Sequence, residues 1–472
     1  MARIVVVGAG MGGMAGAARL AVAGHRVTVL ERGPVHGGAV RRLERDGFGF
    51  DTGPGLLHLP AVWRDLFLKT GREPLEECVR LTEVDPAAEH RFPDGTVTRV
   101  PGFSRGGLRQ ALDASLGKGA GERWAALLVR ARQTWEETRR PLMEEPLTPR
   151  ARDEASSRDP YPAAPRRGLP GRRGPGGLAG VARRELRDPR LTAMLAGTLP
   201  AWGLDPRTAP ASAAVLPYIE ETFGTWYPAG GMRALADAVH ARCLARGVEF
   251  VFGAEAVRVL QRDGRAAGVE LADGTRHEAD AVVWGAARPG DRPAAGSRVT
   301  VLLALRGPRP PGTAHRTLVH PARPLGDPLE HPVVLCLRPG DPALVPGPDH
   351  ESAVLSAAVP AGGPADPVAF ADRLLATADA AGLGLGPRVL WREIRTPRDV
   401  EQDTGAPGGL IPGPALAGAG GAFLPASTAG RLPGTYRVGG WSHPGGGVAH
   451  GGMSGALAAG LIVEGPDWQG SY

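Results

Sequence analysis

The feature that most constrains the fold is a succession of strand, glycine loop, helix and second strand within the first 31 residues. Arg3 to Val7 is a short β-branched run, typical of a strand buried on both faces of a parallel sheet. The loop Gly8-Ala9-Gly10-Met11-Gly12-Gly13 follows at once and satisfies the pattern GxGxxG. An alanine-rich stretch over residues 15–23 predicts a helix, and residues 25–30 predict a second strand that ends in an acid. This order predicts an α/β dinucleotide-binding fold.

Each glycine of the loop has a separate task in such a fold. Gly8 permits the tight turn, Gly10 lets the backbone approach a pyrophosphate, and Gly13 lets helix and strand pack closely. Met11 and Gly12 complete the loop, and the N-terminus of the helix that follows would face the phosphates with its free N–H groups and partial positive charge.

The acid after the second strand is Glu31, placed to accept hydrogen bonds from a ribose. An acid at this position favours a free 2′-hydroxyl, as in FAD or NAD, over the 2′-phosphate of NADP. Arg32 is the next residue and would also lie near the ribose.

Two stretches after Glu31 favour FAD over NAD as the bound nucleotide. A second glycine pair, Gly37-Gly38, is followed by Gly47-Phe48-Gly49-Phe50-Asp51-Thr52-Gly53-Pro54. Here the sequence resembles the FAD-dependent phytoene desaturase family, within the glutathione-reductase-like and amine-oxidase-like flavoproteins. The resemblance implies that the glycine pair passes the FAD diphosphate and that Gly53 and Pro54 approach the flavin. The family usually has Arg directly after the pair, where this chain has Ala39, with Arg41 and Arg42 slightly later.

Two later segments extend the resemblance. Residues 224–232 match the family's GxWYPxGGM element, and residues 436–447 resemble its GxGTHPGxG element. Gly440 stands where many related flavoproteins carry Asp, as small residues do in bacterial desaturases. The resemblance further implies that backbone groups around Val257 hold the adenine.

A small-residue helix is expected from about Gly452 to Ile462. Its first-turn N–H groups would face the flavin's N1 and C2 oxygen and stabilise the negative charge that arrives with a hydride. His443 is the only catalytic residue we predict, as a general base, with a structural hydrogen-bonding role as the alternative.

The predicted site residues are therefore as follows. The cofactor-binding set is Gly8, Gly10, Met11, Gly12, Gly13, Glu31, Arg32, Gly37, Gly38, Ala39, Val257, Gly439, Gly440 and Gly447. The set expected to line the flavin or the substrate is Gly53, Pro54, Trp226, Tyr227 and Trp441, with core packing as the alternative for the three aromatic residues.

Composition excludes several other classes of protein. A formal charge of +6 over 472 residues lacks the density of a nucleic-acid binder. The three cysteines lie far apart without metal-type spacing, so we predict reduced thiols, no metal and a cytoplasmic protein. No apolar run is long enough to cross a bilayer, and the first one leads into the glycine loop rather than a cleavage site. The Arg-, Pro- and Gly-rich residues 151–184 predict a solvated loop, with contact to the inner membrane face as the alternative.

The expected architecture is a discontinuous α/β flavoprotein. A Rossmann-like FAD-binding domain would combine residues 1–100, 215–290 and 415–472. Residues 101–214 and 291–414 would form an α+β substrate domain with a helical part and a sheet part.

The implied activity is FAD-dependent dehydrogenation of a long, apolar polyene by hydride transfer to flavin N5, with oxygen or a quinone as electron acceptor. Three alternatives remain open: a redox-neutral carotenoid isomerase, an amine oxidase, and a non-catalytic isoprenoid-binding protein. Many amine oxidases place a lysine beside the flavin, and this chain has only Lys69 and Lys118, both outside the motifs.

Overall fold

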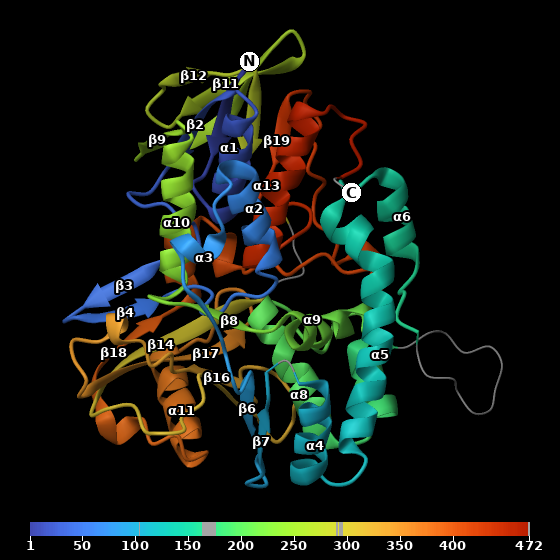
Figure 1. Cartoon of the computed structure of the whole chain (residues 1–472), viewed down its shortest axis with the longest axis vertical. Helices are drawn as coiled ribbons and strands as arrows, with labels where there is room; N and C mark the ends of the chain where they lie inside the picture. The colour runs from blue at the N-terminus through green and yellow to red at the C-terminus, as the bar shows by residue number, and fades with distance from the viewer. Residues whose placement is uncertain (103, 163–175, 289–290, 292–295, 471–472) are drawn as a thin grey trace, which may run out of the picture.

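A computed structural model describes residues 1–102, 104–162, 176–288, 291 and 296–470. Figure 1 shows a five-stranded sheet with its helices at one end, a larger sheet at the other end, and a group of helices beside the larger sheet. No helix in the described ranges combines the length and apolarity needed to cross a membrane.

The five-stranded sheet is parallel throughout, and its strands come from distant parts of the chain. Its order is β19-β13-β1-β2-β9. The strands are β1 (Arg3–Val7), β2 (Arg26–Glu31), β9 (Glu249–Phe252), β13 (Ala281–Trp284) and β19 (Thr435–Arg437). The strand expected at residues 3–7 is confirmed to the residue.

The β1 side chains alternate between two covering layers. Ile4 and Val6 pack against the helices α1 (Met11–Val22), α10 (Met232–Ala245) and α13 (Val448–Val463). Val5 and Val7 pack instead with the side of the sheet covered by β10 (Ala256–Arg262), β11 (Arg265–Leu271) and β12 (Arg276–Glu278). This part of the chain therefore has three layers.

Helices α1 and α13 both begin four residues earlier than expected. We expected starts near residues 15 and 452, whereas α1 begins at Met11 and α13 at Val448. The extra residues include Gly12, Gly13 and Gly451, and host–guest scales rank glycine as a poor helix former. Packing overrides that preference: a Cβ on Gly13 would collide with the Gly8 carbonyl oxygen and lie 3.3 Å from Val6 Cγ1.

The larger sheet has seven strands in the order β18-β14-β17-β16-β15-β6-β7. Helix α11 (Pro367–Ala380) packs on one of its faces (Figure 1). The strands are β6 (Ala88–Arg91), β7 (Val97–Val100), β14 (Ser297–Arg306), β15 (Arg316–Val319), β16 (Val334–Leu337), β17 (His350–Val359) and β18 (Val389–Arg395). Strand β6 runs parallel to β15, so residues just before position 100 join this sheet.

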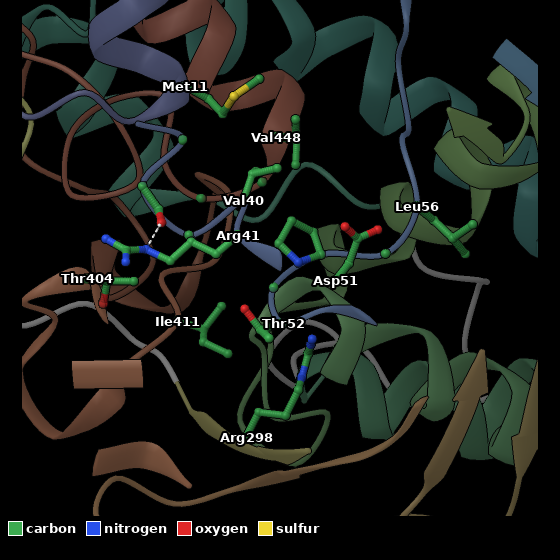
Figure 2. Close-up of a pocket in the computed structure, with 18 of the residues that line it drawn as sticks. Met11, Val40, Arg41, Asp51, Thr52, Leu56, Arg298, Thr404, Ile411 and Val448 are labelled. Atoms are coloured by element: carbon green, nitrogen blue, oxygen red, sulfur yellow. Dashed lines mark hydrogen bonds between the residues drawn. The ribbon is translucent and has the colours of Figure 1, made fainter. Parts of the chain in front are cut away.

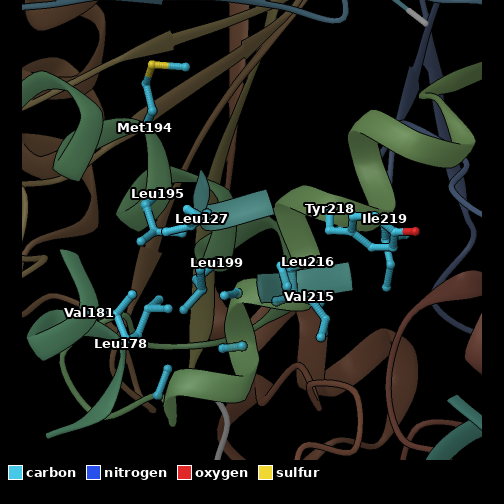
Figure 3. Packing of buried hydrophobic residues seen from close by; sticks show 14 of the residues in the cluster. Leu127, Leu178, Val181, Met194, Leu195, Leu199, Val215, Leu216, Tyr218 and Ile219 are labelled. Atoms are coloured by element: carbon cyan, nitrogen blue, oxygen red, sulfur yellow. The ribbon is translucent and has the colours of Figure 1, made fainter. Parts of the chain in front are cut away.

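The helices beside this sheet share one apolar core (Figure 3). They are α4 (Arg105–Leu116), α5 (Ala120–Arg139), α7 (Gly177–Val181), α8 (Pro189–Thr198) and α9 (Val215–Phe223). Helix α6 (Pro149–Ser157) has no buried residue and adds none to this core. The remaining pieces are the hairpin β3 (Arg42–Arg45) and β4 (Phe48–Asp51), the pair β5 (Leu81–Glu83) and β8 (Trp226–Pro228), and the helices α2 (Ala61–Gly71), α3 (Leu75–Cys78) and α12 (Pro397–Thr404).

The solvated loop expected over residues 151–184 is wrong at both of its ends. Helix α6 begins where the Thr148 side chain accepts a hydrogen bond from Ala151 N, with Pro149 at the first helical position. Leu178 and Val181 of α7 are buried in the helical core. Arg166, Arg167, Arg172 and Arg173 lie outside the described residues.

Helices α1 and α13 cross without room for side chains at their contact. A Cβ on Gly455 would lie 2.5 Å from Gly16 N and 2.6 Å from Gly12 O, both backbone atoms. A Cβ on Gly12 would lie 2.8 Å from Gly439 N and from Ser454 Oγ. Glycine at these positions therefore sets the distance between the two helices.

Gly455→Ala should force this crossing apart and lower the unfolding free energy by about 1–3 kcal/mol, the usual range for overpacking. Gly106→Ala is the matched control, because a Cβ on this glycine of α4 meets nothing within 4 Å. Urea unfolding of both variants measures the effect. Equal stability of Gly455→Ala and Gly106→Ala would show that the crossing can relax.

Candidate cofactor and substrate site

One cavity of about 370 Å³ lies where the five-stranded sheet meets the larger sheet. Gly8, Gly285 and Gly439, which follow the carboxyl ends of β1, β13 and β19, lie in its wall. This is the edge of a parallel sheet at which α/β proteins bind ligands. The predicted residues that line it are Gly8, Gly10, Met11, Gly12, Gly13, Gly37, Gly38, Ala39, Gly53, Pro54, Tyr227, Gly439, Gly440, Trp441 and Gly447.

The N-terminus of α1 opens into this cavity. Its N-cap is Gly10, and no side chain caps the first turn. A Cβ on Gly38 would lie 2.9 Å from Gly10 Cα, so the two glycine loops pass in close contact. The free N–H groups and the lack of side chains suit a diphosphate.

The N-terminus of α13 opens into the same cavity. Its N-cap is Gly447, again without a side-chain cap, and residues 446–449 with Gly451 form part of the wall. Ser454 Oγ donates to Gly451 O at 2.6 Å and accepts from Gly439 N at 2.7 Å. This bond holds the loop after β19 against the helix, so the rear helix faces the cleft as expected.

Glu31 and Arg32 lie behind the wall rather than in it. The Glu31 carboxylate accepts from Ala9 N and from Gly33 N, both at 2.8 Å. It thus fixes the conformation of the glycine loop, and each oxygen keeps a second lone pair that could accept another hydrogen bond. Arg32 donates to Gln402 O at 2.6 Å and so fastens the end of α12.

Of the two arginines that follow the glycine pair, Arg41 lines the cavity and Arg42 does not. Figure 2 shows Arg41 extending across the cavity, where its Nε donates to Gly38 O at 2.9 Å. Its Nη1 is 3.7 Å from an Asp403 oxygen. Arg41 thus contacts the backbone of the glycine pair, although the residue directly after the pair is Ala39.

Asp51 connects two of the sequence motifs. It accepts from Met232 N at 2.7 Å and from Arg233 N at 3.2 Å, which caps α10 from a distant strand. Burial raises the pKa of this carboxyl to about 6. Tyr227 lines the cavity and donates to Asp341 at 2.9 Å.

Besides Glu31 and Arg32, three further predicted residues do not line the cavity. Val257 lies on β10 with its side chain 51% exposed. Trp226 donates to Phe223 O at 2.9 Å and lies outside the wall. His443 is fully buried, with Nε2 2.9 Å from Glu145 O, and this matches its alternative, structural role.

A polar group that the sequence did not indicate lies on the substrate side. His58, Trp202 and Arg316 line the cavity, and all three approach Glu220 on α9. Arg316 and the Trp202 indole donate to Glu220 at 2.7 and 2.9 Å. His58 Nε2 is 3.8 Å from the same carboxylate, and its Nδ1 has no hydrogen-bond partner in the described part of the chain. No motif spacing reveals this group, because its members come from four separate segments.

The chain matches the family model for flavin-containing amine oxidoreductases over residues 11–289. It belongs to that family. FAD is the cofactor of this fold, and the two glycine-lined helix N-termini and Arg41 fit it. Hydroxyneurosporene desaturase of Rubrivivax gelatinosus is 29% identical over 98% of this chain and 93% of its own length.

Two further comparisons define the likeness. The zeta-carotene-forming phytoene desaturase of Myxococcus xanthus is 34% identical over 61% of this chain, and the match spans only 54% of that enzyme. A solved structure of putrescine oxidase bound to putrescine superimposes with a TM-score of 0.64 at 16% identity, covering 98% of this chain and 99% of the other. The last match confirms the α/β flavoprotein fold.

Arg41→Met should weaken FAD binding roughly tenfold to a hundredfold, since a hydrogen bond to a charged group contributes about 1.5–3 kcal/mol. Arg45→Met is the control, because Arg45 lies on β3 with its side chain 50% exposed and outside the cavity. Flavin titration of the apoproteins measures both affinities. Unchanged affinity in Arg41→Met would remove this arginine from the diphosphate site.

Buried neutral histidines should make the fold sensitive to acid. Burial lowers the pKa of His443 and of His450 to about 4, whereas an unfolded histidine takes up its proton near 6.5. Between these values the unfolded chain binds more protons, so unfolding free energy falls as the pH drops from 6.5 towards 4. Each histidine contributes a slope of about 1.4 kcal/mol per pH unit.

His450→Gln removes one such group and should make this slope shallower by that amount. Urea unfolding of wild type and variant between pH 7.5 and about pH 5 gives the two slopes. Parallel pH dependences would contradict the assignment of His450 as a neutral buried group.

Proposed function

We propose that the protein is an FAD-dependent dehydrogenase of a long, largely apolar polyene. The observation that carries this proposal is that two uncapped helix N-termini, from opposite ends of the chain, open into the cavity that the larger sheet also lines. Leu335, Leu337 and Val354 of that sheet supply an apolar wall for a substrate. The named activities of the relatives, all on carotenoids, support the same substrate class.

We further propose the two-part division expected from the sequence, with one change. Residues 1–100, 215–290 and 415–472 form the cofactor part, except that β6 and β7 belong with the substrate part. Their pairing with β15 supports this change.

Desaturation removes a hydride and a proton from neighbouring carbons. FAD supplies the hydride acceptor when it is bound. The N–H groups at the start of α13 stabilise negative charge at the wall of the cavity. We propose His58, which lines the cavity, as the proton acceptor, because burial lowers its pKa and keeps the ring neutral, while Glu220 stabilises the charged form.

The alternatives differ in what the cavity offers them. Lys69 and Lys118 are exposed and do not line the cavity, which disfavours an amine oxidase that uses a lysine beside the flavin. A redox-neutral isomerase would use the same cavity, and its product has the same hydrogen count as its substrate. A non-catalytic carrier would bind polyene without any change in a bound flavin.

We propose oxygen or a quinone as the electron acceptor. We also propose a cytoplasmic protein with peripheral contact to the inner membrane face, since an apolar polyene resides in the bilayer.

Anaerobic addition of phytoene in liposomes should bleach the yellow holoprotein and yield a product two hydrogens lighter. Absorbance at the flavin band and mass analysis of the extracted pigment report the two events. Isomerised product with unchanged mass would favour the isomerase. If several polyenes bind but cause no bleaching and give no product, only the non-catalytic carrier would remain as an explanation.

His58→Gln should lower kcat by at least about a hundredfold, the lower bound for a general base, with flavin content unchanged. His240→Gln is the control, since His240 stacks on His36 outside the cavity. In wild type the rate should stay level above neutrality and fall on the acid side of pH 6.5, as His58 becomes protonated. A full rate in His58→Gln would require another proton acceptor.

A further inference from the structure

The face of the larger sheet that lines the cavity carries polar side chains as well as apolar ones. Along β14, Val299, Val301 and Leu303 pack with α11 on the far face. Arg298 and Thr300 alternate with them and line the cavity. Thr300 is opposite Ser356 of β17, and Ser356 also lines the cavity. A hydrocarbon substrate has no polar group that could form hydrogen bonds with these side chains.

Arg298 is the cation of this row, and the described residues give it no acidic partner. Its Nη2 donates to the carbonyl oxygens of Pro200 at 3.1 Å and Ala201 at 3.5 Å. No carboxylate lies within 4.0 Å of it in the described ranges. Burial without a nearby negative charge lowers the pKa of Arg298.

The other arginines of the cavity wall differ from Arg298 in this respect. Arg316 is paired with Glu220 at 2.7 Å and Arg395 with Asp403 at 2.5 Å. Arg41 faces Asp403 at 3.7 Å. Removing a cation from water without a counter-charge is unfavourable, so an unpaired arginine in a cleft is matched to an anionic ligand.

The ligand chemistry follows from the shape of the row. A guanidinium presents two parallel N–H donors that fit the two oxygens of a carboxylate. The hydroxyls of Thr300 and Ser356 make no side-chain hydrogen bond within the described part of the chain, and they can donate to the same group. One cation with two hydroxyls matches a singly charged end group better than a diphosphate.

We propose that Arg298, with Thr300 and Ser356, forms a subsite for a terminal carboxylate on the polyene substrate. That the substrate is a polyene rests on the proposed function, whereas that it carries a carboxylate rests on Arg298 alone. The substrate is then an oxidised isoprenoid that enters with its acid end against β14 and its chain along Leu335, Leu337 and Val354. A reaction that oxidises a chain terminus must supply it.

The test compares ligands that differ only at one end, with holoprotein that has its full flavin content. Retinoic acid, retinol and a hydrocarbon polyene serve as probes, and the change in flavin absorbance measures binding. We expect the acid to bind roughly tenfold to a hundredfold more tightly than the alcohol, the range for a hydrogen bond to a charged group. Arg298→Met should abolish that preference, and Arg298→Lys should keep part of it.

Arg306→Met is the matched control, because Arg306 ends the same strand with an exposed side chain outside the cavity. It should preserve the preference for the acid. Loss of flavin in Arg298→Met would assign this arginine to the cofactor diphosphate and overturn the subsite. Equal binding of acid and alcohol to wild type would also overturn it, while bleaching by hydrocarbon polyenes would leave the proposed dehydrogenase intact.

Discussion

Helices α1 and α13 cross where Gly16 meets Gly455, and this contact fixes both ends of the cofactor site. The crossing leaves no space for a Cβ, so the two helix axes approach as closely as their backbones allow. Each helix begins without a side-chain cap and opens into the same cavity. The unpaired N–H groups at both starts would be unfavourable in an empty apolar cleft, and an anionic cofactor satisfies them.

The substrate side depends on a different set of constraints. The larger sheet presents one face to α11 and the other to the cavity, so alternate residues of β14 have opposite environments. The neighbouring helices contribute Trp202 and Glu220, which meet His58 and Arg316 at the edge of the sheet. The Glu220 carboxylate keeps its charge because Arg316 and the Trp202 indole donate to it, and burial keeps the nearby His58 neutral. Such a pair is suited to accept a proton at neutral pH.

Local sequence was enough to predict the parts that depend on glycine. Gly8, Gly10 and Gly13 lie where a dinucleotide loop requires them, and Gly447 precedes the rear helix as expected. These glycines can be recognised in the sequence because only a residue without a Cβ permits such close contacts. The helix starts were less accurate, since packing made Gly12 and Gly451 helical against their intrinsic preference.

Side chains that meet only in the folded chain could not be recognised in the sequence in this way. His58, Glu220 and Arg316 come together only when the loop before α2, helix α9 and strand β15 have assembled. Arg298 is unpaired because no described carboxylate lies within 4.0 Å of it in the folded chain. His443 lay within the right motif, but its ring turns into the core towards Glu145. Arg32 looked like a ribose contact, whereas its side chain extends to α12. Proximity in a motif predicts the path of the backbone better than the direction of a side chain.

A crystal structure of the protein grown with FAD tests the central claim most directly. The account predicts a flavin whose diphosphate contacts Gly10 to Gly12 and Arg41, and whose pyrimidine edge meets the N–H groups of residues 448–451. A flavin whose ring system lies away from the start of α13, or an ordered crystal soaked with FAD that shows no density between the two helices, would contradict it.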